Sequence, residues 1–160
     1  MTLEQRAMEL LEKCRQQSLK LATAESCTGG MVAALLTSIA GSSDVFDCGF
    51  VTYSNEAKER MLGISCDLIA EHGAVSRECA LAMAHGAILK SVATLVVSIT
   101  GIAGPSGGSE EKPVGLVHFA CARRNGATQH REMKFGDIGR AAVRLASVDI
   151  ALDLLETQLR

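Results

Sequence analysis

Two residues that can act as nucleophiles, Ser26 and Cys27, are adjacent in the segment TAESCTGGMVAALL, residues 23–36. The pattern predicts that they end a short strand and that Gly29 and Gly30 open a helix. A hydroxyl or thiol in such a turn can attack a carbonyl group, while unpaired N–H groups at the helix start hold the negative charge that develops. The segment is therefore a candidate active-site turn.

The same turn has two other interpretations. Glycines let an anion approach the backbone closely, so Thr28, Gly29 and Gly30 could bind a phosphate. A Walker-type loop is excluded, because no Gly-Lys-Ser/Thr sequence follows. Alternatively, Ser26 or Thr28 is only a helix cap, and the glycines allow tight packing. Cys27, the rival nucleophile, has no histidine near it in sequence, although a partner need only be near in space. Spacing alone leaves these possibilities open.

A second set of reactive residues follows in TYSNEAKERMLG, residues 52–63, which contains the only tyrosine, Tyr53. Lys58 falls on the first turn of a predicted short helix. A lysine that is desolvated at the edge of a pocket can lose its proton and act as the base for a serine. The commoner alternatives are an exposed helix lysine and a tyrosine that only packs against apolar neighbours.

Two further segments contain residues that can hold a substrate. The segment TGIAGPSGGSEEKPVG, residues 100–115, leaves a predicted buried strand where ligands bind in open α/β sheets, so Thr100 and Gly101 are candidate binding residues. The rest of it is either a mobile polar lid or a long surface connection. Arg140 and Arg144 lie one helical turn apart and can grip a phosphate or carboxylate, or belong to a solvated face. The four histidines fit no metal-ligand spacing, so we predict no metal site.

The composition of the 160-residue chain predicts one globular domain, residues 1–160. Hydrophobic residues make up 48% and charged residues 21%, which is typical of a folded domain. A net charge of −2 without any Lys/Arg block argues against nucleic-acid binding. We find no signal peptide and no apolar run long enough for a membrane helix. The six cysteines form no CxxC pair, so we expect buried thiols and a cytoplasmic protein.

Hydrophobic periodicity and turn residues predict the elements that position these side chains. The predicted helices cover 2–17 (with Thr2 and Gln5 as a capping box), 31–39, 55–62, 66–73, a stretch capped by Ser76, and a long C-terminal stretch capped by Asp137. The predicted strands cover 20–26, 44–54, 93–104, 114–123 and 127–135. Asn-Gly between the last two predicts a hairpin. The order predicts a three-layer α/β/α domain with a mixed sheet that includes a C-terminal antiparallel hairpin.

Several of these segments together resemble a known family. The stretches AESCTGG, AGSSDVF, GFVTYSNEAKERMLGI, GAVS, TGIAGPSGG and KPVGLVHF, with a terminal GD…R…VR helix, are similar to the C-terminal domain of the competence/damage-inducible protein CinA. They are also similar to its stand-alone relatives, the nicotinamide-nucleotide amidases. The resemblance covers residues 19–155, nearly the whole chain, and its motifs are long and distinctive.

The resemblance implies an enzyme that hydrolyses the carboxamide of nicotinamide mononucleotide, giving nicotinic acid mononucleotide and ammonia in bacterial pyridine nucleotide recycling. It implies a serine nucleophile, a lysine base, and no metal or other cofactor. On this sequence the serine of AESCTGG is Ser26 and the lysine of YSNEAK is Lys58, with Tyr53 beside them.

For substrate binding, the resemblance implies that Thr28, Gly29 and Gly30 supply N–H groups to an oxyanion or phosphate. The TGIAGP segment and a terminal arginine would enclose the nucleotide. Many relatives have Gly-Asp-Arg before the last helix, whereas GDIGR places Arg140 two residues later, so the phosphate role is open between Arg140 and Arg144. Relatives called CinA also have an N-terminal domain that resembles molybdopterin-binding proteins. This chain starts at its own capped helix, and we expect any activity of that domain to be absent.

Three hypotheses about function follow. The leading one is a Ser/Lys amidohydrolase acting on nicotinamide mononucleotide. The alternatives are a non-catalytic nucleotide-binding module linked to competence or the DNA-damage response, and a general amidase or peptidase. We expect a small-molecule nucleotide as the binding partner, with no nucleic acid and no membrane. We also expect a homo-oligomer, because low charge and alanine-rich helix faces allow association.

Overall fold

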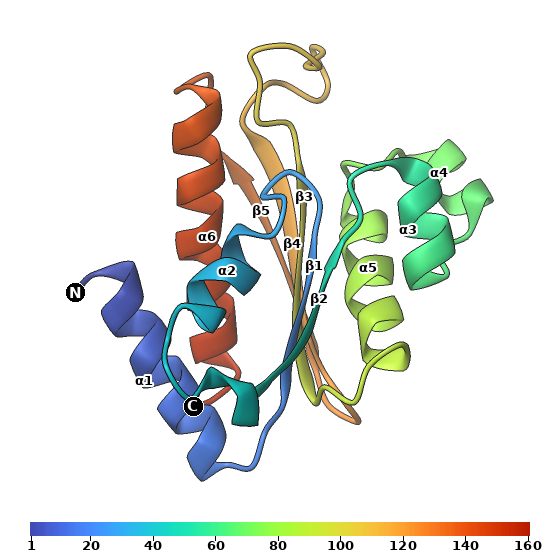
Figure 1. Cartoon of the computed structure of the whole chain (residues 1–160). Coiled ribbons are helices and arrows are strands. Elements are labelled where there is room, and N and C mark those ends of the chain that lie inside the picture. The colour runs from blue at the N-terminus through green and yellow to red at the C-terminus, as the bar shows by residue number, and fades with distance from the viewer.

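A five-stranded sheet forms the centre of the computed structural model, which describes residues 1–160 (Figure 1). Its strands are β1 (Leu21–Glu25), β2 (Phe46–Val51), β3 (Leu95–Gly101), β4 (Leu116–Arg123) and β5 (Thr128–Lys134). Their spatial order is β2-β1-β3-β4-β5. Strand β1 is parallel to β2 and β3, whereas β4 is antiparallel to β3 and β5. The predicted mixed sheet with its C-terminal hairpin is confirmed.

Helices cover both faces of the sheet (Figure 1). One face carries α1 (Leu3–Gln16), α2 (Met31–Thr37) and α6 (Arg140–Thr157). The other face carries α3 (Asn55–Leu62), α4 (Cys66–His72) and α5 (Arg77–Leu89). A 3-10 helix, η1 (Ser42–Asp44), precedes β2. The three layers are those that the alternation of helices and strands predicts.

Each face of the sheet has its own hydrophobic core. Val97 and Phe119 belong to the core beneath α1, α2 and α6, and Ala24 and Val96 belong to the core beneath α5. Because β3 is buried on both faces, its sequence is an almost continuous run of apolar and β-branched residues rather than an alternating one. Strand β1 is also fully buried, although its sequence, LATAE, contains Thr23 and Glu25. Helix α5 also lies very close to α3, since a Cβ at Gly86 would lie 2.2 Å from a main-chain oxygen of that helix.

The start of α6 differs from the prediction. The sequence predicts Asp137 as the cap, but α6 begins at Arg140 and its N-cap is Gly139, which makes no side-chain capping bond. Gly139 has a φ of +100°, a conformation that favours glycine. This turn separates Asp137 from the helix, so the prediction is wrong. The capping box at Thr2 and the cap at Ser76 are confirmed.

The carboxyl ends of the three mutually parallel strands meet at one edge of the sheet. The N–H of Ser26, after β1, donates to the carbonyl of Ile99 in β3 at 2.9 Å. The N–H of Thr52, after β2, donates to the carbonyl of Glu25 in β1 at 2.9 Å. The long loop between β3 and β4, yellow in Figure 1, extends beyond the sheet at this end. Such an edge is where open α/β sheets bind ligands.

Candidate active site

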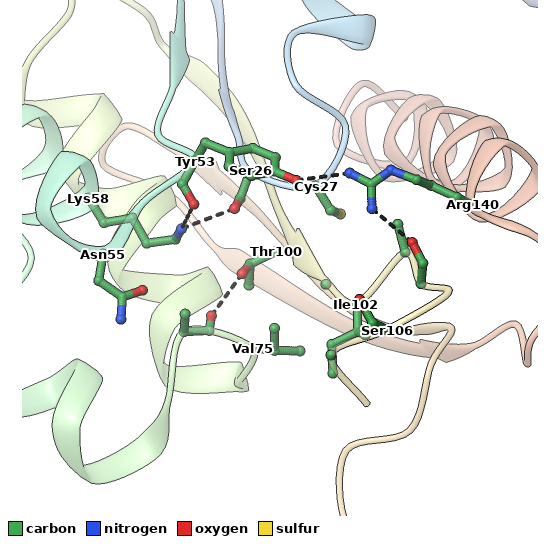
Figure 2. Close-up of a pocket in the computed structure, with 15 residues that line it drawn as sticks. Ser26, Cys27, Tyr53, Asn55, Lys58, Val75, Thr100, Ile102, Ser106 and Arg140 are labelled. Carbon is green, nitrogen blue, oxygen red and sulfur yellow. Dashed lines mark hydrogen bonds between the residues drawn. The ribbon is translucent and has the colours of Figure 1, made fainter. Parts of the chain in front are cut away.

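Ser26 and Lys58 are in direct contact at this edge (Figure 2). The Lys58 Nζ lies 3.0 Å from the Ser26 Oγ. Both residues are buried, with 8% of Ser26 and 1% of Lys58 exposed. The two residues are 32 positions apart in sequence, and they meet because Ser26 ends β1 while Lys58 follows the neighbouring strand β2.

The position of Lys58 is fixed by the start of α3. Ser54 caps this helix by accepting a hydrogen bond from the N–H of Ala57 at 3.0 Å. The Lys58 Nζ then reaches back to the carbonyl oxygens of Thr52 at 2.8 Å and Tyr53 at 3.4 Å. A neutral amine has two N–H donors for these two carbonyls, which leaves its lone pair for the hydroxyl of Ser26.

The electrostatic environment favours the neutral form of Lys58. Burial lowers the pKa of Lys58 below its ordinary value of 10.5, because desolvation penalises the ammonium form. All three hydrogen-bond partners of Nζ are uncharged oxygens, so no carboxylate in contact with it opposes this effect. A lysine in this state can accept the proton of a serine hydroxyl.

Cys27 is a much weaker candidate nucleophile than its neighbour. Its side chain is buried, and burial raises the pKa of the Cys27 thiol to about 11. A thiol with this pKa stays protonated at neutral pH, and the thiolate is the reactive form. Ser26 therefore has a base in contact with it, whereas Cys27 has neither an activated thiol nor a side-chain hydrogen bond to a base.

A buried carboxylate holds the turn after Ser26. Glu25, at the end of β1, is completely buried, and its carboxylate accepts hydrogen bonds from the Thr28 hydroxyl at 2.8 Å and the Val32 and Ala33 N–H groups at 2.9 and 3.0 Å. Glu25 therefore accepts hydrogen bonds from N–H groups in the first turn of α2, which the sequence predicted to face a ligand. Sequence reasoning missed Glu25, because the contact depends on where α2 lies relative to β1.

A cavity of about 340 Å³ opens beside Ser26 and Lys58. It is lined by Ser26, Cys27, Tyr53, Asn55, Lys58, Ala74, Val75, Thr100, Gly101, Ile102, Ala103, Gly104, Ser106, Gly107 and Arg140. Of the sequence-predicted residues, Thr28, Gly29, Gly30 and Arg144 are not among them. Sequence reasoning did not select Asn55 or Ser106, whose polar side chains also belong to the lining (Figure 2).

The two candidate arginines take different positions. Arg140 lines the cavity, where its Nη1 donates to the carbonyl of Gly104 and its Nη2 to the hydroxyl of Tyr53, both at 2.9 Å (Figure 2). Tyr53 is 61% exposed, so its hydroxyl orients Arg140 at the mouth of the cavity rather than contacting Ser26. Arg144 instead donates to main-chain carbonyls of the turn after Ser26.

Thr100 and Gly101 form the wall of the cavity on the β3 side. The Thr100 hydroxyl donates to the carbonyl of Ala74 at 2.8 Å, which joins β3 to the loop before α5 (Figure 2). A Cβ at Gly101 would lie 2.7 Å from the Val117 side chain and 2.9 Å from the Leu116 carbonyl oxygen. The close approach of β4 therefore accounts for glycine at position 101.

The metal-ligating side chains form no candidate metal centre. No group of three or more His, Cys, Asp or Glu residues is arranged to hold a metal ion. Two of the histidines contact each other on the hairpin, where His118 Nδ1 lies 2.9 Å from His130 Nε2. None of the helices combines the length and the apolar character that crossing a membrane requires.

Comparison with known proteins gives one consistent result. The family model of the CinA C-terminal domain matches residues 3–159. The chain is 52% identical to the nicotinamide-nucleotide amidohydrolase PncC of Escherichia coli K12, and the match covers 94% of each. It is 49% identical to a CinA-like protein of Geobacter sulfurreducens over 91% of this chain. It spans only about a third of that protein, as the match covers 35% of its length.

The solved structures agree with the sequence matches. The crystal structure of the competence/damage inducible protein CihA from Agrobacterium tumefaciens superimposes with a TM-score of 0.97 at 52% identity, covering 99% of this chain and 96% of that one. A competence damage-inducible protein A from Klebsiella pneumoniae gives a TM-score of 0.94 at 34% identity.

Proposed function

Because the chain belongs to the CinA C-terminal domain family, we propose that it is a nicotinamide-nucleotide amidohydrolase. The reaction would convert nicotinamide mononucleotide and water into nicotinic acid mononucleotide and ammonia, as a step in pyridine nucleotide recycling. The observation that carries this proposal is the contact of Ser26 Oγ with Lys58 Nζ at 3.0 Å, at the wall of a cavity. A hydroxyl next to an amine that has no carboxylate in contact with it is an arrangement suited to acyl transfer.

In the first half of the reaction, Ser26 would attack the carboxamide carbon while its proton moves to Lys58 Nζ. The carbonyl oxygen then carries a negative charge. The N–H of Cys27 donates to no other residue, and Cys27 lines the cavity. We assign this N–H to the oxyanion, because the residue after a nucleophile commonly fills that role at a strand-to-helix turn.

In the second half, the C–N bond breaks and Lys58 returns its proton to the departing nitrogen, which leaves as ammonia. The product of this step is a nicotinoyl ester on Ser26. A water molecule then gives a proton to Lys58 and attacks the ester carbon, and the proton passes back to Ser26 Oγ as the acid leaves. Lys58 thus acts as base and then acid while the ester forms, and again as base and then acid while it is hydrolysed.

The phosphate of the substrate is assigned to Arg140 at the cavity mouth. Its guanidinium has N–H donors beyond the two held by Gly104 and Tyr53, and a guanidinium suits the planar recognition of phosphate oxygens. The Ser106 hydroxyl lines the same end of the cavity. Thr28, Gly29 and Gly30 keep a role in shaping the nucleophile turn rather than in touching the nucleotide.

The direct test is the release of ammonia from nicotinamide mononucleotide by purified protein in the presence of a chelator. We expect turnover that the chelator does not reduce. Free nicotinamide, which lacks the phosphate, should be a poor substrate, and equal turnover of both would favour a general amidase. Tight nucleotide binding by calorimetry without product over hours would instead support a non-catalytic nucleotide-binding module.

We also propose a cytoplasmic homo-oligomer. All six cysteines are free, as expected in a reducing compartment. Leu89 and Val92, at the end of α5, are 79% and 68% exposed, which provides apolar surface for association. Light scattering that reports only a 16.9 kDa particle would contradict the oligomer.

A further inference from the structure

The turn that carries Ser26 has a flexible sequence and a fixed shape. Gly29 and Gly30 have φ values of +58° and +101°, and glycine loses more conformational freedom on ordering than any other residue. Within the turn, the Gly29 N–H donates to the Ser26 carbonyl at 3.0 Å and the Met31 N–H to the Thr28 carbonyl at 3.1 Å. The remaining constraints must come from outside the turn.

Arg144, on α6, supplies two of these constraints. Its Nε donates to the carbonyl oxygen of Cys27 at 3.0 Å, and its Nη2 donates to that of Thr28 at 3.2 Å. The guanidinium is half-buried, and both of its hydrogen bonds go to this turn. A Cβ at Gly29 would lie 3.3 Å from Nη2, so the turn lies tightly against the arginine.

Glu25 holds hydrogen-bond donors of this region, whereas Arg144 holds acceptors. Its carboxylate takes one donor from the turn, the Thr28 hydroxyl, and two from the first turn of α2. Arg144 binds carbonyl oxygens of the turn, whereas Glu25 binds a hydroxyl and N–H groups that follow it. The two side chains therefore hold complementary sets of polar atoms, and both of them bind Thr28.

These contacts determine the orientation of three consecutive peptide groups. A trans peptide is planar, so its N–H and C=O point in opposite directions. The Ser26 carbonyl is held by the Gly29 N–H, and the Cys27 and Thr28 carbonyls are held by Arg144. The Cys27 N–H, on the peptide that begins with the Ser26 carbonyl, consequently points away from that bond and donates to no other residue.

We propose that Arg144 is a positioning residue for Ser26, acting together with Glu25. By holding the Cys27 and Thr28 carbonyls, Arg144 keeps the Ser26 Oγ next to Lys58 Nζ and keeps the Cys27 N–H available for the oxyanion. The two arginines, one helical turn apart on α6, then have different functions, since Arg140 binds the substrate and Arg144 binds the turn. The inference rests on the proposed amidohydrolase function.

Steady-state kinetics of Arg144→Met test this role, because methionine keeps an unbranched apolar stem and removes the donors. We expect kcat to fall by about 10- to 100-fold, the scale of a small misplacement of a reacting group, while KM stays within about twofold. Arg144→Lys should recover some of the lost kcat, because the ammonium still donates hydrogen bonds. The recovery should be incomplete, because one ammonium cannot hold both carbonyls as the planar guanidinium does. Millimolar guanidinium ion should partly restore Arg144→Met.

The matched control is Arg6→Met, which removes another arginine that fastens α6. Arg6 joins α1 to Asp149, Asp153 and Glu156 of α6, and none of its partners belongs to the turn. If Arg144 only held α6 in place, both variants would change kcat alike. We expect Arg6→Met to keep the wild-type kcat.

A second readout does not depend on the substrate. An aryl sulfonyl fluoride forms a bond from its sulfur to Ser26 Oγ, with loss of fluoride and transfer of the hydroxyl proton to Lys58, and mass spectrometry identifies the modified residue. We expect Arg144→Met to slow this labelling by a factor similar to the loss in kcat, with an unchanged melting temperature. Labelled wild-type protein that releases no ammonia would refute the proposed substrate, while the ratio of labelling rates would still decide the role of Arg144.

Three outcomes would overturn the inference. They are a raised KM with unchanged kcat in Arg144→Met, labelling at the wild-type rate in that variant, and wild-type protein that is not labelled at Ser26. If Arg144→Met does not fold, the labelling rate and kcat of Arg144→Lys decide between the same alternatives.

Discussion

Arg6 and Lys58 are two basic residues in opposite environments. Arg6, on α1, contacts three carboxylates of α6, and its hydrogen bond to Glu156 is the main reason that its pKa is raised. Lys58 is 1% exposed, all its hydrogen-bond partners are uncharged oxygens, and burial lowers its pKa. Carboxylates therefore surround the guanidinium of Arg6, whereas no carboxylate contacts the amine of Lys58.

The difference in environment separates a basic residue that stabilises the fold, Arg6, from one that can take part in a reaction, Lys58. Carboxylates around Arg6 keep it ionised and join the first helix to the last, which gives a modest stabilisation at the surface. Burial without a counter-ion costs stability, because the ammonium of Lys58 loses its hydration. The same burial favours the neutral form of the amine next to Ser26, and perturbed groups in clefts are characteristic of functional sites.

The largest expected effect is that of replacing Lys58. Lys58→Met removes the base, and Lys58→Arg introduces a group that stays protonated, so both should lower kcat by about 10²- to 10⁴-fold. Ammonia release under saturating substrate measures this loss. Substantial activity in Lys58→Arg would show that a neutral side chain at this position is not required. The difference in environment between Lys58 and Arg6 would then have no catalytic consequence.

Arg140 is a third basic residue, and its environment is intermediate between those of Arg6 and Lys58, since its partners are a carbonyl and a tyrosine hydroxyl. Arg140→Met should raise KM for the mononucleotide by about 10- to 100-fold, the value of a hydrogen bond to a charged group, with a smaller change in kcat. The slow hydrolysis of free nicotinamide, which has no phosphate, should be unaffected. An equal loss with both substrates would remove Arg140 from the phosphate site.

The pH dependence of the wild-type enzyme provides a sharper view of Lys58. Only the neutral amine can accept the Ser26 proton, so log kcat/KM should rise with pH by about one unit per pH unit below the lowered pKa of Lys58 and level off above it. Cys27→Ala should keep this profile. A profile that instead rises near pH 11, where the thiol of Cys27 ionises, would point to the cysteine.

The smallest expected effect on activity is that of Arg6→Met. We expect kcat and KM to remain at wild-type values and the free energy of unfolding to fall by about 1 kcal/mol, because its ion pairs are partly solvated. Urea denaturation and steady-state kinetics on the same preparation measure both. A loss of kcat comparable to that of Lys58→Met would show that the two regions are not independent.

The sequence predicts most of the fold because its signals are local. The alternating segment of β1, the continuous apolar run of β3, the Asn-Gly hairpin and the capping residues Thr2 and Ser76 each depend on a few neighbouring residues. Asp137 failed as a cap because a glycine turn intervenes before α6, and a good capping residue does not determine which turn precedes the helix.

The site is predictable only in part. The family resemblance selected Ser26 and Lys58, and the structure places them in contact. Spacing could not distinguish Arg140 from Arg144, because residues one turn apart share a helix face and only the position of α6 along the sheet decides which one reaches the cavity. Glu25 was hidden for the same reason, since a buried glutamate at a strand end has no local signature.

The central claim is that Ser26, activated by a neutral Lys58, performs the attack. Its most direct test compares the release of ammonia from nicotinamide mononucleotide by Ser26→Ala and Cys27→Ala, with circular dichroism to show that both are folded. We predict that Ser26→Ala loses activity by about 10³-fold or more, as for other serine nucleophiles, whereas Cys27→Ala stays within about threefold of the wild type. Loss of activity in Cys27→Ala with activity retained in Ser26→Ala would contradict the account.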